Sequence, residues 1–158
     1  MFDSIPRTAW TGPGRTRELM ADLVWRERIN VGQMFVDTQT VIPRGFRTDL
    51  YSVRFLGKLI TPDVAEQQGP AILHDYGYTV QGISRAEADR QLLDAMASVG
   101  VGLVRRWLIY AGVRVGGWVA WRRNNQELTT DPRAWLELHG IYRPELHGPR
   151  AEIDAIDV

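Results

Sequence analysis

The first half of the chain has the pattern of β-structure. Apolar residues partly alternate with polar or charged ones from Glu18 to Val31, and the run from Met34 to Pro43 is rich in β-branched residues. A period of two and β-branched side chains are typical of strands. Asn30 and Gly32 lie between the two runs and suit a tight turn. We therefore expect a β-hairpin over residues 18–43.

The period becomes helical in the middle of the chain. Apolar residues at intervals of three and four predict a helix over residues 70–80, which Gly82 ends. Ser84 and Glu87 then form a capping-box pattern, in which each side chain can bond the other residue's backbone, so a second helix is expected over 84–98. Because the connection is so short, the two helices should pack antiparallel as an αα-hairpin.

A third, strongly apolar helix is expected over residues 101–123, where it would form the back wall of the core. It is long enough to span a bilayer, but Arg105, Arg106 and Arg114 lie within it. Each of these charges costs roughly 2.5 to 3.5 kcal/mol at a membrane centre, so no transmembrane segment is expected.

The end of the chain differs from the rest in composition. Residues 124–158 are polar, punctuated by proline and acidic at the end, which indicates a C-terminal extension with a partly ordered docking segment and a tail. The remainder, residues 1–123, predicts a single α+β domain, with a small antiparallel β-sheet followed by a three-helix unit that contains the αα-hairpin.

Composition narrows the classes of function. The 158 residues include 19 Lys and Arg and 19 Asp and Glu, so no bulk charge favours nucleic acid as a partner. The absence of cysteine excludes disulfides, thiolate metal sites and a cysteine nucleophile. Prolines and arginines interrupt the first residues, which therefore lack the apolar core of a secretory signal. We expect a protein that is made and folds in the cytoplasm.

One short segment concentrates candidate chemistry. HDYGYTVQGISRAEAD, residues 74–89, begins on the first expected helix and ends on the second. His74 and Tyr78 are four residues apart, which places their Cβ atoms about 5 to 6 Å from each other. Asp75 is turned about 100° away from His74. Asp89 lies in the second turn of the next helix, where it can face back toward His74.

This arrangement has a clear chemical use and a structural alternative. A histidine held by Asp89 is fixed in one tautomer and can take a proton from water as a general base. Asp75 can ligate a hard cation such as Ca²⁺, which would polarise a substrate carbonyl. If Asp49 approaches His74 and Asp75, these three side chains can equally hold a transition metal such as Zn²⁺. Alternatively, His74, Tyr78 and Asp89 only lock two helices together through hydrogen bonds.

The order of these features resembles a known family. Over residues 18–121 the hairpin, the segments PRGFRTD, GPAILHDYGY and SRAEADRQLLDAM, and the arginine-bearing apolar helix are similar to the domain of unknown function 1353. That resemblance implies a small protein encoded by a tailed phage or prophage, made in the host cytoplasm.

A shorter resemblance carries a mechanism. AILHDYGY followed by AEADRQLL looks like the H-D-x-x-Y and Asp helix pair of phospholipase A2 enzymes, especially the disulfide-poor bacterial and parvoviral forms. The resemblance implies that His74 is the general base, that Tyr78 and Asp89 orient it, and that Asp75 ligates calcium. The nearest candidates for the glycine-bearing calcium loop contain Gly45 and Gly57.

Three hypotheses follow from these patterns. The first is a metal-assisted ester hydrolase of phospholipase A2 type, acting on lipid or another component of the cell envelope. The second is a non-catalytic virion protein of the tail or tail tip, which binds other phage proteins and uses the same residues only for structure. The third is a zinc-dependent hydrolase of the cell wall. His139 and His147 lie in the polar C-terminal segment and are expected to face solvent.

Overall fold

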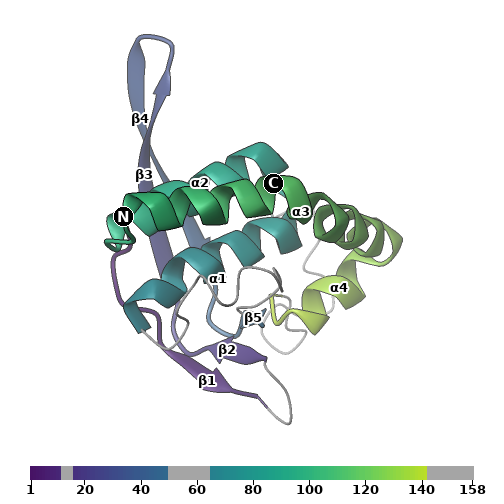
Figure 1. Ribbon diagram of the computed structural model, residues 1–158. Coiled ribbons are helices and arrows are strands. Elements are labelled where there is room, and N and C mark those ends of the chain that lie inside the picture. The colour runs from purple at the N-terminus through teal and green to yellow at the C-terminus, as the bar shows by residue number, and fades with distance from the viewer. Residues whose placement is uncertain (12–15, 50–64, 142–158) are drawn as a thin grey trace.

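The strands come first in the chain and the helices after them. The computed structural model describes residues 1–11, 16–49 and 65–141, and in that part of the chain a β-region at the N-terminal side packs beneath and beside a layer of helices (Figure 1). The expected α+β class is confirmed.

A small antiparallel sheet lies at the base of the molecule. It has the order β1 (Thr8–Trp10), β2 (Arg17–Leu19) and β5 (Arg47–Thr48). The prediction of one strand running on from residue 18 is wrong, because Leu19 ends β2 and its backbone N–H donates to the carbonyl oxygen of Phe46. This sheet matters for the site because β5 carries Thr48.

The predicted hairpin is confirmed over a shorter range. β3 (Leu23–Val31) and β4 (Met34–Ile42) pair in antiparallel register along their whole length. Gly32 in the connecting turn has a φ of 68°, a left-handed conformation that glycine adopts without steric cost. Figure 1 shows the far end of the hairpin projecting away from the body of the protein, whereas Leu23 and Ile42 at its base are buried in the core.

Four helices follow in the described part of the chain: α1 (Ala65–Val80), α2 (Arg85–Ser98), α3 (Leu103–Thr130) and α4 (Pro132–Leu138). The capping box that begins α2 is confirmed, since the Ser84 side chain accepts from the backbone N–H of Glu87 and the Glu87 side chain accepts from that of Ser84. α1 and α2 pack against each other, and α3 packs on both.

The helix boundaries differ from the predictions at two places. α1 begins at Ala65 instead of at residue 70, so Pro70 lies inside the helix, where it removes one backbone donor. α3 continues to Thr130 without interruption at residue 123. The division of the chain into a domain over 1–123 and an extension over 124–158 stays a prediction, and residues 142–158 of that extension lie outside the described residues.

Two groups of buried apolar side chains form the core. One joins the strands to α1 and to one residue of α2, Ala95: Leu19, Leu23, Trp25, Ile42, Phe46, Ala71, Ile72, Leu73 and Ala95. The other joins α2 to α3: Leu92, Met96, Val101, Ile109 and Val113. The expectation that α3 forms the core's back wall is only half right, because its inner side is buried and its outer apolar side chains are exposed. Among the described residues, no helix combines the length and hydrophobicity that a bilayer crossing requires.

Candidate functional site

The close approach of α1 and α2 positions the predicted residues. Gly77 of α1 faces Ala88 of α2 so closely that a Cβ atom at Gly77 would lie 3.3 Å from the Cβ of Ala88. The next residue, Asp89, is fully buried and points its carboxylate at α1. The helix pair therefore brings Asp89 to His74, as the spacing along the chain predicts.

The His74 ring is held at one nitrogen. Its Nε2 atom lies 2.9 Å from Oδ1 of Asp89, and the Tyr78 hydroxyl donates to the same oxygen at 2.7 Å. Both His74 and Tyr78 are buried. Because an ionised carboxylate only accepts hydrogen bonds, Nε2 carries the proton and the lone pair of the neutral ring lies on Nδ1. Within the described residues, Nδ1 makes no hydrogen bond, and the ring borders a pocket.

Two arginines complete the surroundings of Asp89, and the sequence patterns did not reveal them. Arg114 of α3 donates to Oδ2 of Asp89 at 2.8 Å, and Arg85 of α2 approaches the same oxygen at 3.4 Å. Arg85 also donates to the backbone carbonyl oxygen of Arg114 at 3.2 Å. Asp89 therefore joins three helices, and both of its oxygens are occupied.

These contacts shift the pKa values of Asp89 and Tyr78 in opposite directions. Burial alone raises the pKa of Asp89, but the hydrogen bonds from His74, Tyr78 and Arg114 outweigh it, so the pKa lies below its usual 3.8. Burial and the bond to the Asp89 carboxylate raise the pKa of the Tyr78 hydroxyl. Asp89 is thus an anion near neutral pH while Tyr78 keeps its proton, so the carboxylate can accept hydrogen bonds from both Tyr78 and the His74 ring.

The Tyr78 side chain packs closely against Gly117 and Trp121 of α3. A Cβ atom at Gly117 would collide with the Tyr78 hydroxyl oxygen, and Trp121 packs edge-on against the Tyr78 ring at a centroid distance of 5.0 Å. His74 also packs against Tyr78, with its ring centroid 4.2 Å from that of Tyr78. A glycine in the middle of this helix therefore has a packing role that its sequence context alone did not indicate.

Asp75 is separate from the Asp89 network, as its position one residue from His74 predicts. Its Oδ2 accepts a hydrogen bond from the Thr48 hydroxyl of β5, and its backbone carbonyl accepts from the Thr79 hydroxyl at 2.8 Å. Asp49, the other predicted metal ligand, follows Thr48 and borders the same pocket. In the ranges that the structure describes, no cluster of three or more His, Cys, Asp or Glu side chains suited to a metal ion is present. The segment that contains Gly57 lies outside these ranges.

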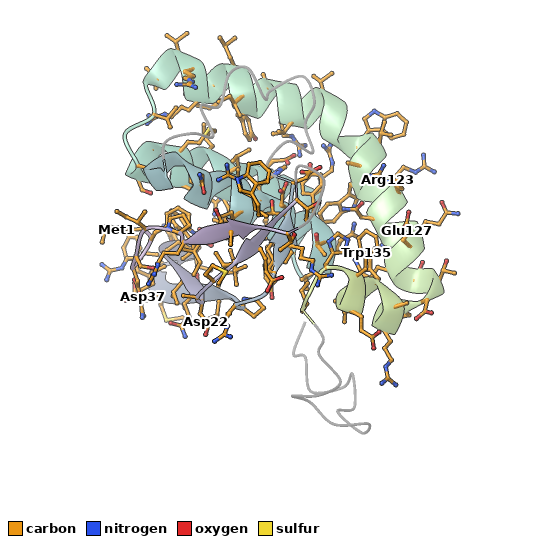
Figure 2. The ribbon with its side chains drawn as sticks, turned by 90° about the horizontal axis from the view of Figure 1, so that it is seen from below. Met1, Asp22, Asp37, Arg123, Glu127 and Trp135 are labelled. Carbon is orange, nitrogen blue, oxygen red and sulfur yellow. The ribbon has the colours of Figure 1, made fainter. Side chains whose placement is uncertain are left out.

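A pocket of about 720 Å³ opens over His74 and Asp75. This volume lies within the range typical of ligand sites, about 300 to 1,000 Å³. Its wall is formed by β5, α1, α3 and the end of α4, including Thr48, Asp49, Tyr78, Gly116, Gly117, Ala120, Arg123, Glu127, Trp135 and His139. Figure 2 shows Arg123 and Glu127 on α3, with Trp135 on the neighbouring α4. The pocket thus brings together residues from both halves of the chain.

α4 closes one side of the pocket. The indole N–H of Trp135 donates to the backbone carbonyl oxygen of Thr79 at 3.0 Å, which ties α4 to the end of α1. His139 is less exposed than expected: its side chain is half-buried, because its ring packs against Trp135 at a centroid distance of 4.2 Å and borders the pocket. Burial lowers the pKa of His139. His147 lies outside the described residues.

Comparison with known proteins places the chain in a family without assigning an activity. No curated protein and no solved structure shows significant similarity to it. Residues 17–113, more than half of the 158, match the family described as a protein of unknown function, DUF1353. This range includes the hairpin, His74, Asp75, Tyr78, Asp89 and the start of α3, and it ends one residue before Arg114. The chain therefore belongs to the domain of unknown function 1353 family.

Proposed function

We propose that the protein is an ester hydrolase in which His74 activates water. The observation that supports this proposal is the position of the imidazole between Asp89 and the pocket. Nε2 is bonded to a buried carboxylate, and the ring borders a pocket of about 720 Å³. A pocket of this size beside the ring can admit a substrate.

The step follows from the two ring nitrogens. Nδ1 accepts a proton from a water molecule as that water attacks the carbonyl carbon of an ester, and the Asp89 carboxylate stabilises the imidazolium that forms. The tetrahedral intermediate then expels the alcohol, which takes the proton back from Nδ1. The products are a carboxylic acid and an alcohol, and His74 returns to its neutral form.

We propose Ca²⁺ as the metal and an acyl ester of the lipid envelope as the substrate. Asp75 and Asp49 both border the pocket and supply the carboxylate oxygens that Ca²⁺ prefers. Because Ca²⁺ takes about six to eight oxygen ligands, these two residues provide only part of a coordination shell. When bound, the ion would polarise the ester carbonyl. The phospholipase A2 pattern in residues 74–89 supports this choice, and an origin in a tailed phage or prophage remains part of the proposal.

A non-catalytic role in the virion is the second candidate, and one observation favours it. Asp89 accepts hydrogen bonds from α1, α2 and α3, which is also what a structural junction requires. In this version the protein is a tail or tail-tip component that binds other virion proteins. The zinc-dependent cell-wall hydrolase differs from both, since Nδ1 of His74 would then ligate Zn²⁺ and could not act as a base.

Hydrolysis and stability measured on the same variant separate these candidates. The purified protein is given p-nitrophenyl butyrate and phosphatidylglycerol vesicles with Ca²⁺, and release of alcohol or fatty acid is recorded. His74→Gln should abolish turnover while the protein still unfolds cooperatively on heating. If the unaltered protein releases no product from either ester with Ca²⁺ or Zn²⁺, and His74→Gln only lowers the melting temperature, the network is structural.

A further inference from the structure

The outer face of α3 carries an unusual set of exposed apolar side chains. Val104 is 73% exposed and Val115 is 78% exposed. Large apolar side chains also exposed on this helix are Leu103, Trp107, Leu108, Trp118 and Val119. Scattered exposed apolar residues are ordinary, but a contiguous apolar surface on a folded protein usually marks an interaction site. We call these seven residues the α3 outer face.

This face is distinct from the face that holds α3 to the protein. The buried residues of α3 are Ile109, Val113 and Gly117, which recur every four residues and point toward α1 and α2. The exposed residues recur at intervals of three and four on the other side of the helix. α3 therefore has two apolar sides, and packing within the described chain covers only one.

Charge indicates what covers the other side. From Leu103 to Gln126 the helix contains five arginines and neither Asp nor Glu, although the whole chain has no net charge. Arg114 is neutralised by Asp89, while Arg122 lies over the ring of Trp118, 5.8 Å from its centroid. A helix with tryptophan and aliphatic residues on one face, and with arginine beside them, fits the boundary between anionic headgroups and acyl chains.

We propose that the α3 outer face docks on the surface of an anionic phospholipid bilayer. A second copy of the chain is the competing occupant, because Val104, Leu108, Val115 and Trp118 have the spacing of a coiled-coil seam. Pairing two such helices would set arginine against arginine, with no acidic residue between Leu103 and Gln126 to compensate. An anionic membrane supplies that compensation from its phosphates.

The docked orientation also has a consequence for the pocket. Gly116, Ala120 and Arg123 border the pocket, and each is adjacent in the chain to a residue of the outer face or to Arg122. A bilayer held against α3 therefore lies beside the pocket. The docking surface stands on its own residues and does not depend on whether His74 is a catalytic base.

Co-sedimentation with vesicles tests the surface. The full chain is mixed with vesicles of phosphatidylcholine alone or of phosphatidylcholine with phosphatidylglycerol, and the bound fraction is measured at low and high salt. Binding should need phosphatidylglycerol and weaken with salt. The triple variant Val104→Gln, Leu108→Gln and Val119→Gln should bind at least about tenfold more weakly, because it loses buried apolar area.

Exposed apolar residues elsewhere provide the matched control. Met34 and Phe35 at the tip of the β-hairpin are 67% and 71% exposed, and Met34→Gln with Phe35→Gln should leave vesicle binding unchanged. His74→Gln should bind like the unaltered protein, whatever its effect on hydrolysis. If the triple variant loses its fold in a thermal melt, Arg122→Gln tests the charge beside Trp118 and should weaken binding in the same direction.

Three results overturn the proposal. The first is no binding of the unaltered protein to phosphatidylglycerol vesicles. The second is an equal loss of binding in the hairpin variant and the α3 variant. The third is a dimer, found by light scattering, that the α3 variant dissociates while vesicles are not bound, which would make this face an interface between two copies of the chain.

Discussion

The Nε2 atom of His74 lies 2.9 Å from Oδ1 of Asp89, and neither side chain is more than 4% exposed. A carboxylate in this position keeps the imidazole in one tautomer and compensates the charge that the ring gains when it takes a proton. Asp89→Asn keeps the shape of the side chain and removes that charge. We expect kcat for ester hydrolysis to fall by about 10²- to 10⁴-fold, as measured by product release at saturating substrate.

The same substitution should also destabilise the fold, by about 2 to 4 kcal/mol, because Arg114 and Arg85 lose their anionic partner. Urea unfolding measures this cost. Asp94→Asn is the control, since Asp94 lies on the same helix and is exposed. A rate close to that of the unaltered protein in Asp89→Asn would remove Asp89 from the proposed mechanism, even if stability fell.

Gly117 and Tyr78 form a second pair whose coupling can be measured. A Cβ atom at Gly117 would collide with the Tyr78 hydroxyl oxygen, whereas the next ring atoms would lie 3.3 and 3.4 Å away. Gly117→Ala should therefore cost about 1 to 3 kcal/mol by displacing the hydroxyl from Asp89. In Tyr78→Phe that oxygen is absent, so the added methyl group should cost little.

A double-mutant cycle on urea unfolding gives the coupling between these two positions. Gly116→Ala is the neighbouring control, because a Cβ atom there would meet nothing within 4 Å and alanine should gain about 0.5 to 1 kcal/mol in a helix. Equal costs of Gly117→Ala with and without the Tyr78 hydroxyl would show that the hydroxyl does not depend on this glycine.

The contrast between Asp89 and Arg114 illustrates what the sequence could predict about the site. His74 and Asp89 lie on consecutive helices whose ends are marked by Gly82 and by the capping box at Ser84, so local rules of helix geometry were enough to bring them together. Arg114 reaches Asp89 from α3, 25 residues further along the chain. No local pattern specifies which of the arginines on that helix turns inward.

The same limit applies to the fold. The hairpin and the helices have clear periods, whereas β1, β2 and β5 have only two or three residues each and owe their conformation to pairing with one another. α3 is apolar on two sides, so its period could not indicate which side is buried. The burial of Ile109 and the exposure of Leu108 are decided by the packing of α3 on α1 and α2.

Acid should weaken the fold through Asp89. Its pKa in the folded protein lies below the usual 3.8, so the stability that the carboxylate contributes is fully present above about pH 5 and is lost as the pH falls through the folded-state value. Between about pH 6 and about pH 3, the difference in stability between the unaltered protein and Asp89→Asn should shrink. Urea unfolding at several pH values measures this difference.

Comparing the unaltered protein with Asp89→Asn separates the pH dependence due to Asp89 from that due to other acidic groups. The pKa of Glu87 is also lowered, by its hydrogen bonds with Ser84, and the pKa of Asp37 is lowered by Arg28, but both groups are present in each protein. A difference in stability that stays constant with pH would mean that Asp89 titrates alike in the folded and unfolded chains.

Removal of calcium tests the role proposed for Asp75. If Asp75 holds Ca²⁺ beside His74, hydrolysis should disappear in excess chelator and return when Ca²⁺ is added back. The ion should also raise the melting temperature, because it binds the folded chain in preference to the unfolded one. Asp75→Asn should abolish both effects, whereas Asp94→Asn should keep them. Hydrolysis that persists in chelator would contradict the proposal of a calcium-dependent hydrolase. Recovery of hydrolysis with Zn²⁺ alone would favour the zinc-dependent enzyme, in which His74 is a metal ligand instead of a base.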